Sequence, residues 1–290
     1  MSNNFLDTVS SVWNTGTHIM THKLTASALS AFLRSPKSFY WAYLHQNARG
    51  VEPLPNMKDY AHDLVFGQLW GEFVTYFYAN TGMPQDFQLM WKTRTNGWVD
   101  AKTQEQYANV LQALMLSYLQ QFSPTDGVRT PESSERRYEN DRFYGFIDGI
   151  SDDGILHECK TAKRAMRLDE QLWQVQNSIQ IKLYVVLTQA AGVCIEFAYK
   201  DAPCSVFRTP IVHFNGEQRD KWQWELNSLA DGIALMTERS LKLGHMAFPC
   251  HPSGCTINTK NFTGTCKYRM LCDSDPTADH FYITRNEERR

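Results

Sequence analysis

This sequence lacks several features that would place it in a specialised class. No run of 18 apolar residues occurs, so we expect no helix that crosses a membrane. The first residues contain no basic segment followed by an apolar block, which argues against a secretory signal. Internal repeats and low-complexity tracts are also missing, so nothing points to a repeat architecture or a biased linker.

An excess of charge of one sign is missing as well. The net charge is −2 at pH 7, so binding to nucleic acid would require a local basic patch rather than a basic protein. Seven cysteines without a secretory signal favour reduced thiols or metal ligands in the cytoplasm over disulfides. With 290 residues, of which 42% are hydrophobic, the chain can bury a sizeable core as one large domain or two.

The most informative stretch runs from Tyr144 to Tyr184. Alternating apolar and polar residues on both sides of a polar turn at 151–154 predict a β-hairpin. If Gly154 takes a positive φ in a three-residue loop, Ser151 faces Ile155 and Asp148 lies opposite Glu158.

Two facing carboxylates repel each other unless a cation lies between them. Lys160 follows Glu158 by two residues, so both side chains leave the same face of the strand. Two carboxylates, the backbone carbonyl of Cys159 and one ammonium group suit phosphodiester hydrolysis. In that chemistry a hard metal ion activates water, and a lysine orients the water or stabilises the charge on phosphorus.

The spacing of Asp148, Glu158 and Lys160 resembles the core motif of the PD-(D/E)XK nuclease superfamily. In that family a helix with Gln-x-x-x-Tyr follows the motif, and here Gln180 and Tyr184 match it on one helix face. The resemblance implies Mg²⁺ or Mn²⁺ on Asp148, Glu158 and the Cys159 carbonyl, with Gln180 and Tyr184 orienting the motif strand and touching the nucleic acid. An acidic turn and a lysine on a solvated hairpin remain the alternative.

The N-terminal part carries a second likeness. Residues 24–44 predict two short helices, the second opened by Pro36. The pattern is similar to the entry motif of RecB-like, Cas4-like and RecE-like nucleases of phages and bacteria, and it is formed by Thr25, Ser27, Leu29, Phe32, Ser35, Pro36, Phe39 and Tyr40. An ordinary helical hairpin that packs aromatic rings is the alternative.

A helix predicted over about 58–80 supplies one further candidate ligand. Its apolar residues recur at helical spacing, and Gly67 matches the glycine with which the family's corresponding helix begins. The resemblance implies a His or Glu soon afterwards that reaches the metal. Glu72 is the nearest candidate, one residue out of the commonest register, and a solvated glutamate is the alternative.

The remaining pattern predicts an α/β fold. We expect helices at about 101–122, 168–190 and 216–241, and strands at 134–140, 192–200 and 205–213. The resemblance implies a restriction-endonuclease-like mixed central sheet flanked by helices, with an N-terminal helical region. We expect a loose arm at 1–23, the nuclease domain at 24–244, a Cys-rich segment at 245–280 packed on that domain, and a charged tail at 281–290.

Basic residues cluster immediately after the motif strand. Lys163, Arg164 and Arg167 follow Lys160 and form the densest positive patch near the predicted site. A polyanionic substrate needs such a patch, so we expect these residues to contact DNA. Surface lysines and arginines are also common on a loop of this kind.

Four of the seven cysteines gather near the C-terminal end, at Cys250, Cys255, Cys266 and Cys272. Clustered cysteines without a secretory signal favour a metal site. The ending Cys266-x5-Cys272 resembles the tail of iron–sulfur nucleases related to Cas4 and AddB, which implies a [4Fe–4S] cluster. That family also uses an N-terminal cysteine, which Ser35 replaces here, so zinc and free thiols remain alternatives.

The sequence therefore predicts a metal-dependent DNA nuclease, most simply an exonuclease of phage or recombination type in the cytoplasm of a bacterium or a phage-infected cell. DNA is the expected partner, with a recombination or single-strand-annealing protein as a further one and no membrane. Two other classes remain: a catalytically silent DNA-binding or assembly subunit, and a structural metal protein defined by its cysteines. The intact Asp148, Glu158 and Lys160 argue against the first, and the second would leave the hairpin and the helix with Gln180 and Tyr184 unexplained.

Overall fold

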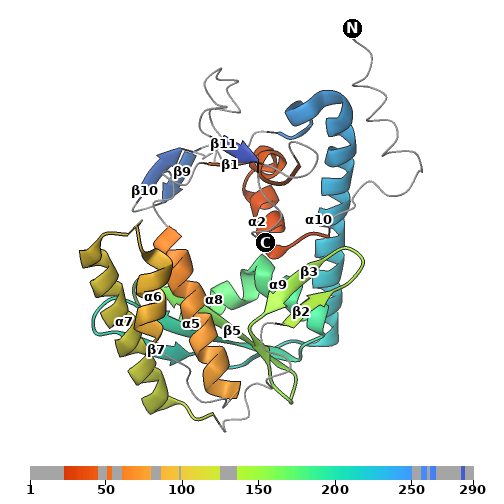
Figure 1. The fold of residues 1–290 in the computed structure, drawn as a ribbon. Coiled ribbons are helices and arrows are strands. Elements are labelled where there is room, and N and C mark those ends of the chain that lie inside the picture. The colour runs from red at the N-terminus through yellow and green to blue at the C-terminus, as the bar shows by residue number, and fades with distance from the viewer. Residues whose placement is uncertain are drawn as a thin grey trace. The chain divides into compact units, whose positions relative to one another are not determined.

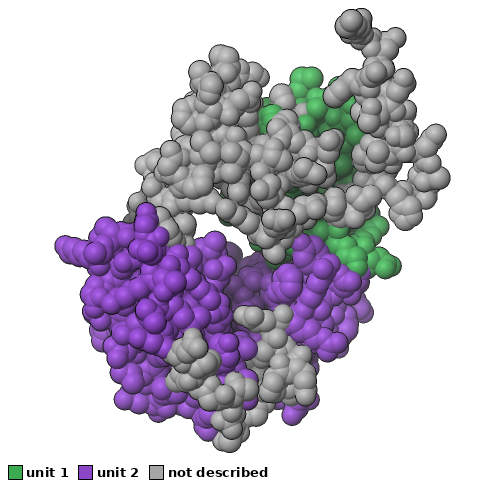
Figure 2. Space-filling view, viewed as in Figure 1, with its two compact units in different colours: residues 1–55, 141–143, 225–290 green, residues 56–140, 144–224 purple. Residues whose placement is uncertain are grey.

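The structure is a computed structural model (Figure 1). It describes residues 23–44, 51–53, 61–79, 86–97, 99–124, 136–249, 256–259, 262–265 and 282–284. The chain divides into two compact units, coloured separately in Figure 2. Unit 1 comprises Met1–Pro55, Asp141–Phe143 and Glu225–Arg290, and unit 2 comprises Asn56–Asn140 and Tyr144–Trp224. The motif residues all belong to unit 2.

A five-stranded mixed sheet forms the centre of unit 2. It is built from β4 (Gly149–Ile150), β5 (Ile155–Ala162), β6 (Gly192–Tyr199), β7 (Ser205–Arg208) and β8 (Val212–His213). Strands β5 and β6 are parallel, whereas the other pairs are antiparallel. All eight residues of β6 are buried, as expected for a strand covered on both faces. The mixed sheet of the expected fold class is therefore confirmed.

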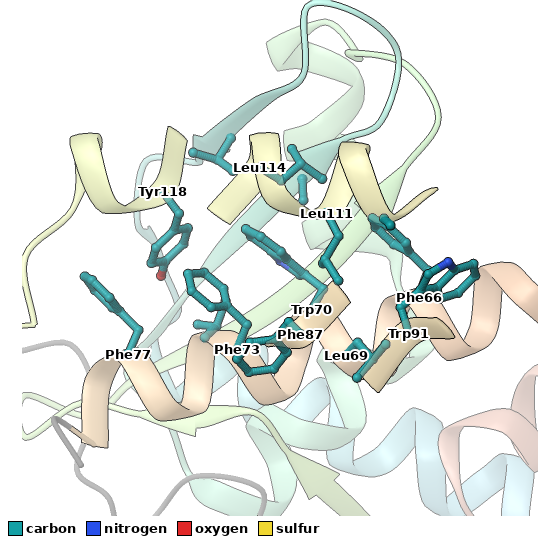
Figure 3. Packing of buried hydrophobic residues seen from close by; sticks show 14 of the residues in the cluster. Phe66, Leu69, Trp70, Phe73, Phe77, Phe87, Trp91, Leu111, Leu114 and Tyr118 are labelled. Carbon is teal, nitrogen blue, oxygen red and sulfur yellow. The ribbon is translucent and has the colours of Figure 1, made fainter. Parts of the chain in front are cut away.

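Three helices build an aromatic core against one face of this sheet. They are α5 (Ala61–Ala79), α6 (Phe87–Thr95) and α7 (Ala101–Gln121), which lie side by side in Figure 1. Their rings interlock in mostly edge-to-face pairs, for example Trp70 with Tyr118 at 5.5 Å and Phe73 with Phe87 at 5.8 Å (Figure 3). Ala198 of β6 and Val206 of β7 close the same cluster. Burial of this many large rings supplies most of the local driving force for folding.

Two further helices follow the motif strand, α8 (Leu168–Asn177) and α9 (Ile179–Thr188). A single helix over 168–190 was predicted, and that prediction is wrong. Ser178 adopts an extended backbone conformation with ψ of 123°, and its side chain accepts a hydrogen bond from the Ile181 N–H. A serine in this conformation caps a new helix instead of continuing the previous one.

A separate two-stranded sheet packs beside α9 within unit 2. It consists of β2 (Arg136–Glu139) and β3 (Tyr144–Ile147), paired antiparallel. Asp148 lies in the bend between β3 and β4, where the chain passes from this sheet into the five-stranded one. The predicted strand at 134–140 is therefore shorter, and the predicted strand at 205–213 is interrupted between β7 and β8.

Unit 1 contains α2 (Ala26–Arg34), α3 (Pro36–Phe39) and the π-helical turn η1 (Tyr40–Leu44). Thr25 caps α2 and Ser35 caps α3, so the two predicted short helices are present. Three pairs of this unit are β1 (Val51–Pro53) with β11 (Tyr282–Thr284), β9 (Thr256–Thr259) with β10 (Phe262–Thr265), and an isolated bridge from Leu24 to Phe143.

The long helix α10 (Gly216–Leu243) begins in unit 2 and ends in unit 1, and η4 (Gly244–Ala247) follows it. The helix predicted over 216–241 is thus present with nearly the expected ends. Cys250, Cys255, Cys266 and Cys272 lie outside the described residues. None of the helices in the described ranges is long and apolar enough to cross a membrane.

Candidate active site

The hairpin that carries the motif has the register expected from its turn. Gly154 has a φ of 78°, and its N–H donates to the Ser151 carbonyl at 2.9 Å. Ser151 in turn donates its N–H to the Ile155 carbonyl at 2.9 Å. Gly149 pairs with His157 and Ile150 with Leu156, so the same register continued by one residue places Asp148 opposite Glu158. A glycine at this positive φ costs little, which fixes the register.

Asp148 is held against the motif strand by the backbone. The N–H of Cys159 donates to Oδ2 of Asp148 at 2.7 Å. The Cys159 carbonyl follows Glu158 directly on β5, the strand to which this bond ties Asp148. A bend in the chain at Asp148, combined with this hydrogen bond, keeps the carboxylate at the junction of the two sheets.

Glu158 and Lys160 meet on one face of β5, as predicted. Lys160 Nζ lies 2.5 Å from Glu158 Oε1, and Glu158 is only 2% exposed. Burial alone would lower the pKa of Lys160, but the carboxylate of Glu158, followed by that of Asp148, raises the pKa above its ordinary value. Lys160 is therefore a positively charged group at neutral pH.

Gln180, at the start of α9, ties the two motif residues together. Its Oε1 accepts a hydrogen bond from Lys160 Nζ at 2.8 Å, and its Nε2 donates to Glu158 Oε1 at 2.9 Å. Only one orientation of the amide allows both bonds, since an ammonium group cannot accept and a carboxylate cannot donate. The side chain thus acts as a clamp across the charged pair.

Tyr184 lies one turn further along α9. Its hydroxyl oxygen accepts a hydrogen bond from Gln180 Nε2 at 3.1 Å, so the predicted spacing of the two residues does bring them together. Burial, followed by the negative charge of Glu158, raises the pKa of Tyr184 far above its ordinary value, so the phenol stays protonated. Its ring lies against Gly145 of β3, where an added Cβ would come within 2.5 Å of the ring.

Other predicted residues lie elsewhere. Both carboxylate oxygens of Glu72 accept hydrogen bonds from Arg94, at 2.7 and 3.0 Å. Lys163 and Arg164 are exposed in the turn after β5. Arg167 precedes α8 and forms an ion pair with Asp169 at 2.9 Å. The predicted ligand role of Glu72 and the predicted DNA contacts of the basic residues stay predictions.

The donor set of the site fits a hard divalent cation. Asp148 and Glu158 offer carboxylate oxygens and Cys159 a carbonyl oxygen, which are the ligands that Mg²⁺ and Mn²⁺ prefer. Within the described residues, no group of three or more His, Cys, Asp and Glu side chains is arranged to hold a metal. A cation here would therefore combine these two side chains with the backbone and with water or substrate oxygens.

Sequence reasoning missed a second polar network on the reverse face of the sheet. Glu196 of β6 accepts a hydrogen bond from Tyr118 at 2.5 Å, and its carboxylate lies 3.5 Å from both His157 and Arg208. The hydroxyl oxygens of Tyr118 and Tyr78 are 2.9 Å apart, and because the single hydroxyl proton of Tyr118 goes to Glu196, Tyr78 is the donor in this second contact. The available signal was a single glutamate inside the apolar run of β6, since a buried carboxylate requires partners.

A family profile and two solved structures resemble this chain. A profile of the PD-(D/E)XK nuclease superfamily matches residues 23–273. No curated protein sequence matches the chain significantly. A phage-related exonuclease of Haemophilus somnus 129PT aligns structurally at 12% identity with a TM-score of 0.38, covering 76% of this chain and 97% of that one.

A candidate exonuclease of Eubacterium rectale aligns at 10% identity with a TM-score of 0.45, covering 83% of this chain and 88% of that one. The profile match extends over most of the chain and includes every motif residue of the site. The chain belongs to the PD-(D/E)XK nuclease superfamily.

Proposed function

We propose that this nuclease is a metal-dependent exonuclease that hydrolyses phosphodiester bonds in DNA. The observation that carries the proposal is the clamped set of Glu158, Lys160 and Gln180 beside Asp148. A buried carboxylate and a charged lysine, held by the same amide, offer a cation site and a positive group at one place.

Asp148, Glu158 and the carbonyl of Cys159 would hold one Mg²⁺ or Mn²⁺ ion. When bound, such an ion polarises a phosphoryl oxygen and lowers the pKa of its water. Glu72 is left out of this set because Arg94 already binds both of its carboxylate oxygens.

Lys160 supplies positive charge to the reacting phosphate. Because the nearby carboxylates raise its pKa, it retains its proton and orients water or stabilises negative charge rather than acting as a base. Gln180 fixes the direction of the ammonium group, and Tyr184 fixes the direction of Gln180. This chain of contacts reduces the number of orientations that the site must sample before it reacts.

Lys163 and Arg164 are the basic residues best placed to contact the DNA backbone. Both are exposed directly after the motif strand, whereas Arg167 already pairs with Asp169. Charge neutralisation of phosphates would make binding weaken steeply between about 50 and 200 mM salt. A flat salt response, or unchanged binding after a joint Lys163→Ala and Arg164→Ala change, would remove this patch from the proposal.

The C-terminal cysteines form a second part of the proposal. Hairpin β9–β10 starts directly after Cys255 and ends directly before Cys266, and its register pairs Thr256 with Thr265. Four cysteines at 250, 255, 266 and 272 in a chain without a secretory signal support a shared metal. Resemblance to iron–sulfur nucleases favours a [4Fe–4S] cluster, with zinc as the alternative.

Elemental analysis of anaerobically purified protein tests the cysteine proposal. About four irons per chain, with broad absorption near ~400 nm, would support the cluster. One zinc per chain in colourless protein would replace it with a structural zinc site. The absence of any bound metal would reject both, and Cys266→Ser should otherwise strip the metal and destabilise unit 1, to which these cysteines belong. The cytoplasmic location and a recombination or annealing partner remain predictions from the sequence.

A cleavage assay tests the main proposal. Purified protein with Mg²⁺ or Mn²⁺ should degrade end-labelled linear DNA progressively and leave covalently closed circles intact. Asp148→Ala, at the acidic junction, should abolish both the cleavage and its metal dependence while leaving the fold unchanged. Nicking of circular DNA would show an endonuclease instead, and full activity in Asp148→Ala would reject the site.

A further inference from the structure

Strand β3, which leads into Asp148, has two different faces. Gly145 and Ile147 point toward the interior: the Tyr184 ring covers Gly145, and Ile147 is fully buried. Because side chains alternate along a strand, Tyr144 and Phe146 lie on the opposite face. Phe146 is 54% exposed there.

The partner strand β2 adds an arginine to this outer face. Arg137 lies directly opposite Phe146, and paired residues on antiparallel strands share a face. The Arg137 guanidinium lies 4.6 Å from the centre of the Tyr144 ring, and the Tyr144 and Phe146 rings are 6.3 Å apart. Glu139 takes part as well, since its carboxylate pairs with Arg137 at 2.7 Å. We call Arg137, Tyr144 and Phe146 the β3 platform.

The β3 platform leads directly to the catalytic carboxylate. Phe146 precedes Asp148 by two residues, which corresponds to about 7 Å along an extended strand. An aromatic surface with a guanidinium beside it therefore lies on the solvent-exposed face of the strand that leads into Asp148.

We propose that the β3 platform stacks an unpaired base of the substrate strand beside the candidate active site. Aromatic rings with adjacent positive charge are the means by which proteins hold single strands without reading their sequence. A base inside a duplex has both faces covered by its neighbours, so only a single-stranded or frayed terminus can occupy the platform. This inference rests on the proposed nuclease function and narrows its substrate to single-stranded DNA or unpaired ends.

A second copy of this chain could also cover the exposed face of the β3 platform. The guanidinium of Arg137 favours the nucleic acid, because a stacked base brings a phosphate with it. The proposed chemistry at Asp148, the residue directly after β3, also requires a phosphate. A second copy of this chain is therefore treated as an outcome of the test.

The test measures stacking without cleavage. A single-stranded oligonucleotide with 2-aminopurine as the terminal base is titrated with the full chain in EDTA, and quenching of its fluorescence reports stacking. Phe146→Ala should weaken binding of this oligonucleotide roughly 10- to 100-fold, which is the usual effect of removing one stacked ring. Phe146→Trp should retain the quenching. An otherwise identical oligonucleotide with an abasic terminal position should bind wild type and Phe146→Ala equally.

Phe207→Ala is the matched control, since Phe207 is a partly exposed phenylalanine on β7 of the other sheet. Equal quenching in wild type and Phe146→Ala would overturn the platform, and so would a change in oligomeric state without a change in binding. The two proposals fail separately. Cleavage without 2-aminopurine quenching would leave the nuclease and remove the platform, whereas quenching without cleavage in Mg²⁺ or Mn²⁺ would do the reverse.

Discussion

Two buried glutamates lie on neighbouring strands of the central sheet, and they face opposite sides. Glu158 on β5 and Glu196 on β6 are each 2% exposed, and each contacts a cationic side chain. Glu196 is paired in register with Cys159, the residue next to Glu158. By burial and charge alone the two carboxylates are nearly indistinguishable.

Their partners differ in origin. Glu158 is bound by Lys160, two residues away on its own strand, and by Gln180 of α9. Glu196 is bound by Tyr118 of α7 and approached by Arg208 of β7, beneath the aromatic core of α5 to α7. Lys160 remains 38% exposed, whereas the Tyr118 side chain is fully buried.

We infer that solvent access separates Glu158, the proposed catalytic carboxylate, from Glu196, the proposed structural one. Lys160 beside Glu158 is 38% exposed, whereas Glu196 lies under the layer of rings formed by α5 to α7. We therefore expect substitutions of Glu158 to affect catalysis and substitutions of Glu196 to affect stability. Measurements of cleavage rate and unfolding free energy test this difference between Glu158 and Glu196.

The largest expected effect is on the rate of DNA cleavage. Glu158→Gln should lower kcat/KM by at least about 100- to 1,000-fold, because it removes one carboxylate of the acidic pair at the site of charge development. Glu196→Gln should retain most of the activity of the folded protein. Steady-state cleavage of end-labelled DNA checks both, and an equal loss in the two variants would erase the distinction.

Stability should show the reverse order. Glu196→Gln should lower the free energy of unfolding by about 3 kcal/mol, because Arg208 then loses a buried counter-charge. Tyr118→Phe should cost less, about 1–2 kcal/mol, since one hydrogen bond to that carboxylate is lost. Urea unfolding with circular dichroism measures both. A Glu196→Gln protein as stable as wild type would show that the network contributes nothing.

The pH dependence of stability tests the charge state of Lys160. Its pKa in the folded state is raised, so its contribution to stability is complete below the unfolded value of about 10.4 and is lost as pH rises through the higher folded value. The difference in unfolding free energy between wild type and Lys160→Met should therefore be constant from about pH 7 to pH 10. A difference that instead rose with pH between about pH 8 and pH 10 would mean a lowered pKa and a lysine able to act as a base.

The smallest effect is expected at the break between α8 and α9. Ser178→Ala removes the side chain that caps α9 and should cost about 1 kcal/mol in stability. Ser178→Thr, which keeps the hydroxyl, should be close to wild type. If activity in Ser178→Ala fell far more than stability, the cap would be positioning Gln180 as well as stabilising the helix.

Local patterns predicted the position of Glu158 but not the buried network of Glu196. The hairpin turn, Gly154 and the spacing of Glu158 and Lys160 all lie within a few residues, so the chain sequence alone determines their register. Glu196 meets Tyr118 across 78 positions, and no periodic pattern reports a contact between such distant residues.

The same limit explains the errors in the fold. The division of residues 168–190 into α8 and α9 was missed because the apolar spacing continues smoothly across Ser178, whereas a single backbone torsion breaks the helix. Helix α6 was not predicted because nine residues give too short a periodic pattern. Its buried residues Phe87 and Trp91 are stabilised by packing against α5 and α7, which the local sequence does not report.

That break has an electrostatic consequence. A continuous helix would carry Gln180 in its interior, where peptide dipoles cancel along the axis. Because α9 starts anew at Ile179, the positive end of its dipole, equivalent to about half an elementary charge, lies in the turn that contains Gln180. The Gln180 side chain hydrogen-bonds to Glu158, so this partial charge lies close to the carboxylate. The interruption thus supplies the acidic site with a fixed partial charge that does not depend on pH or on any titrating group.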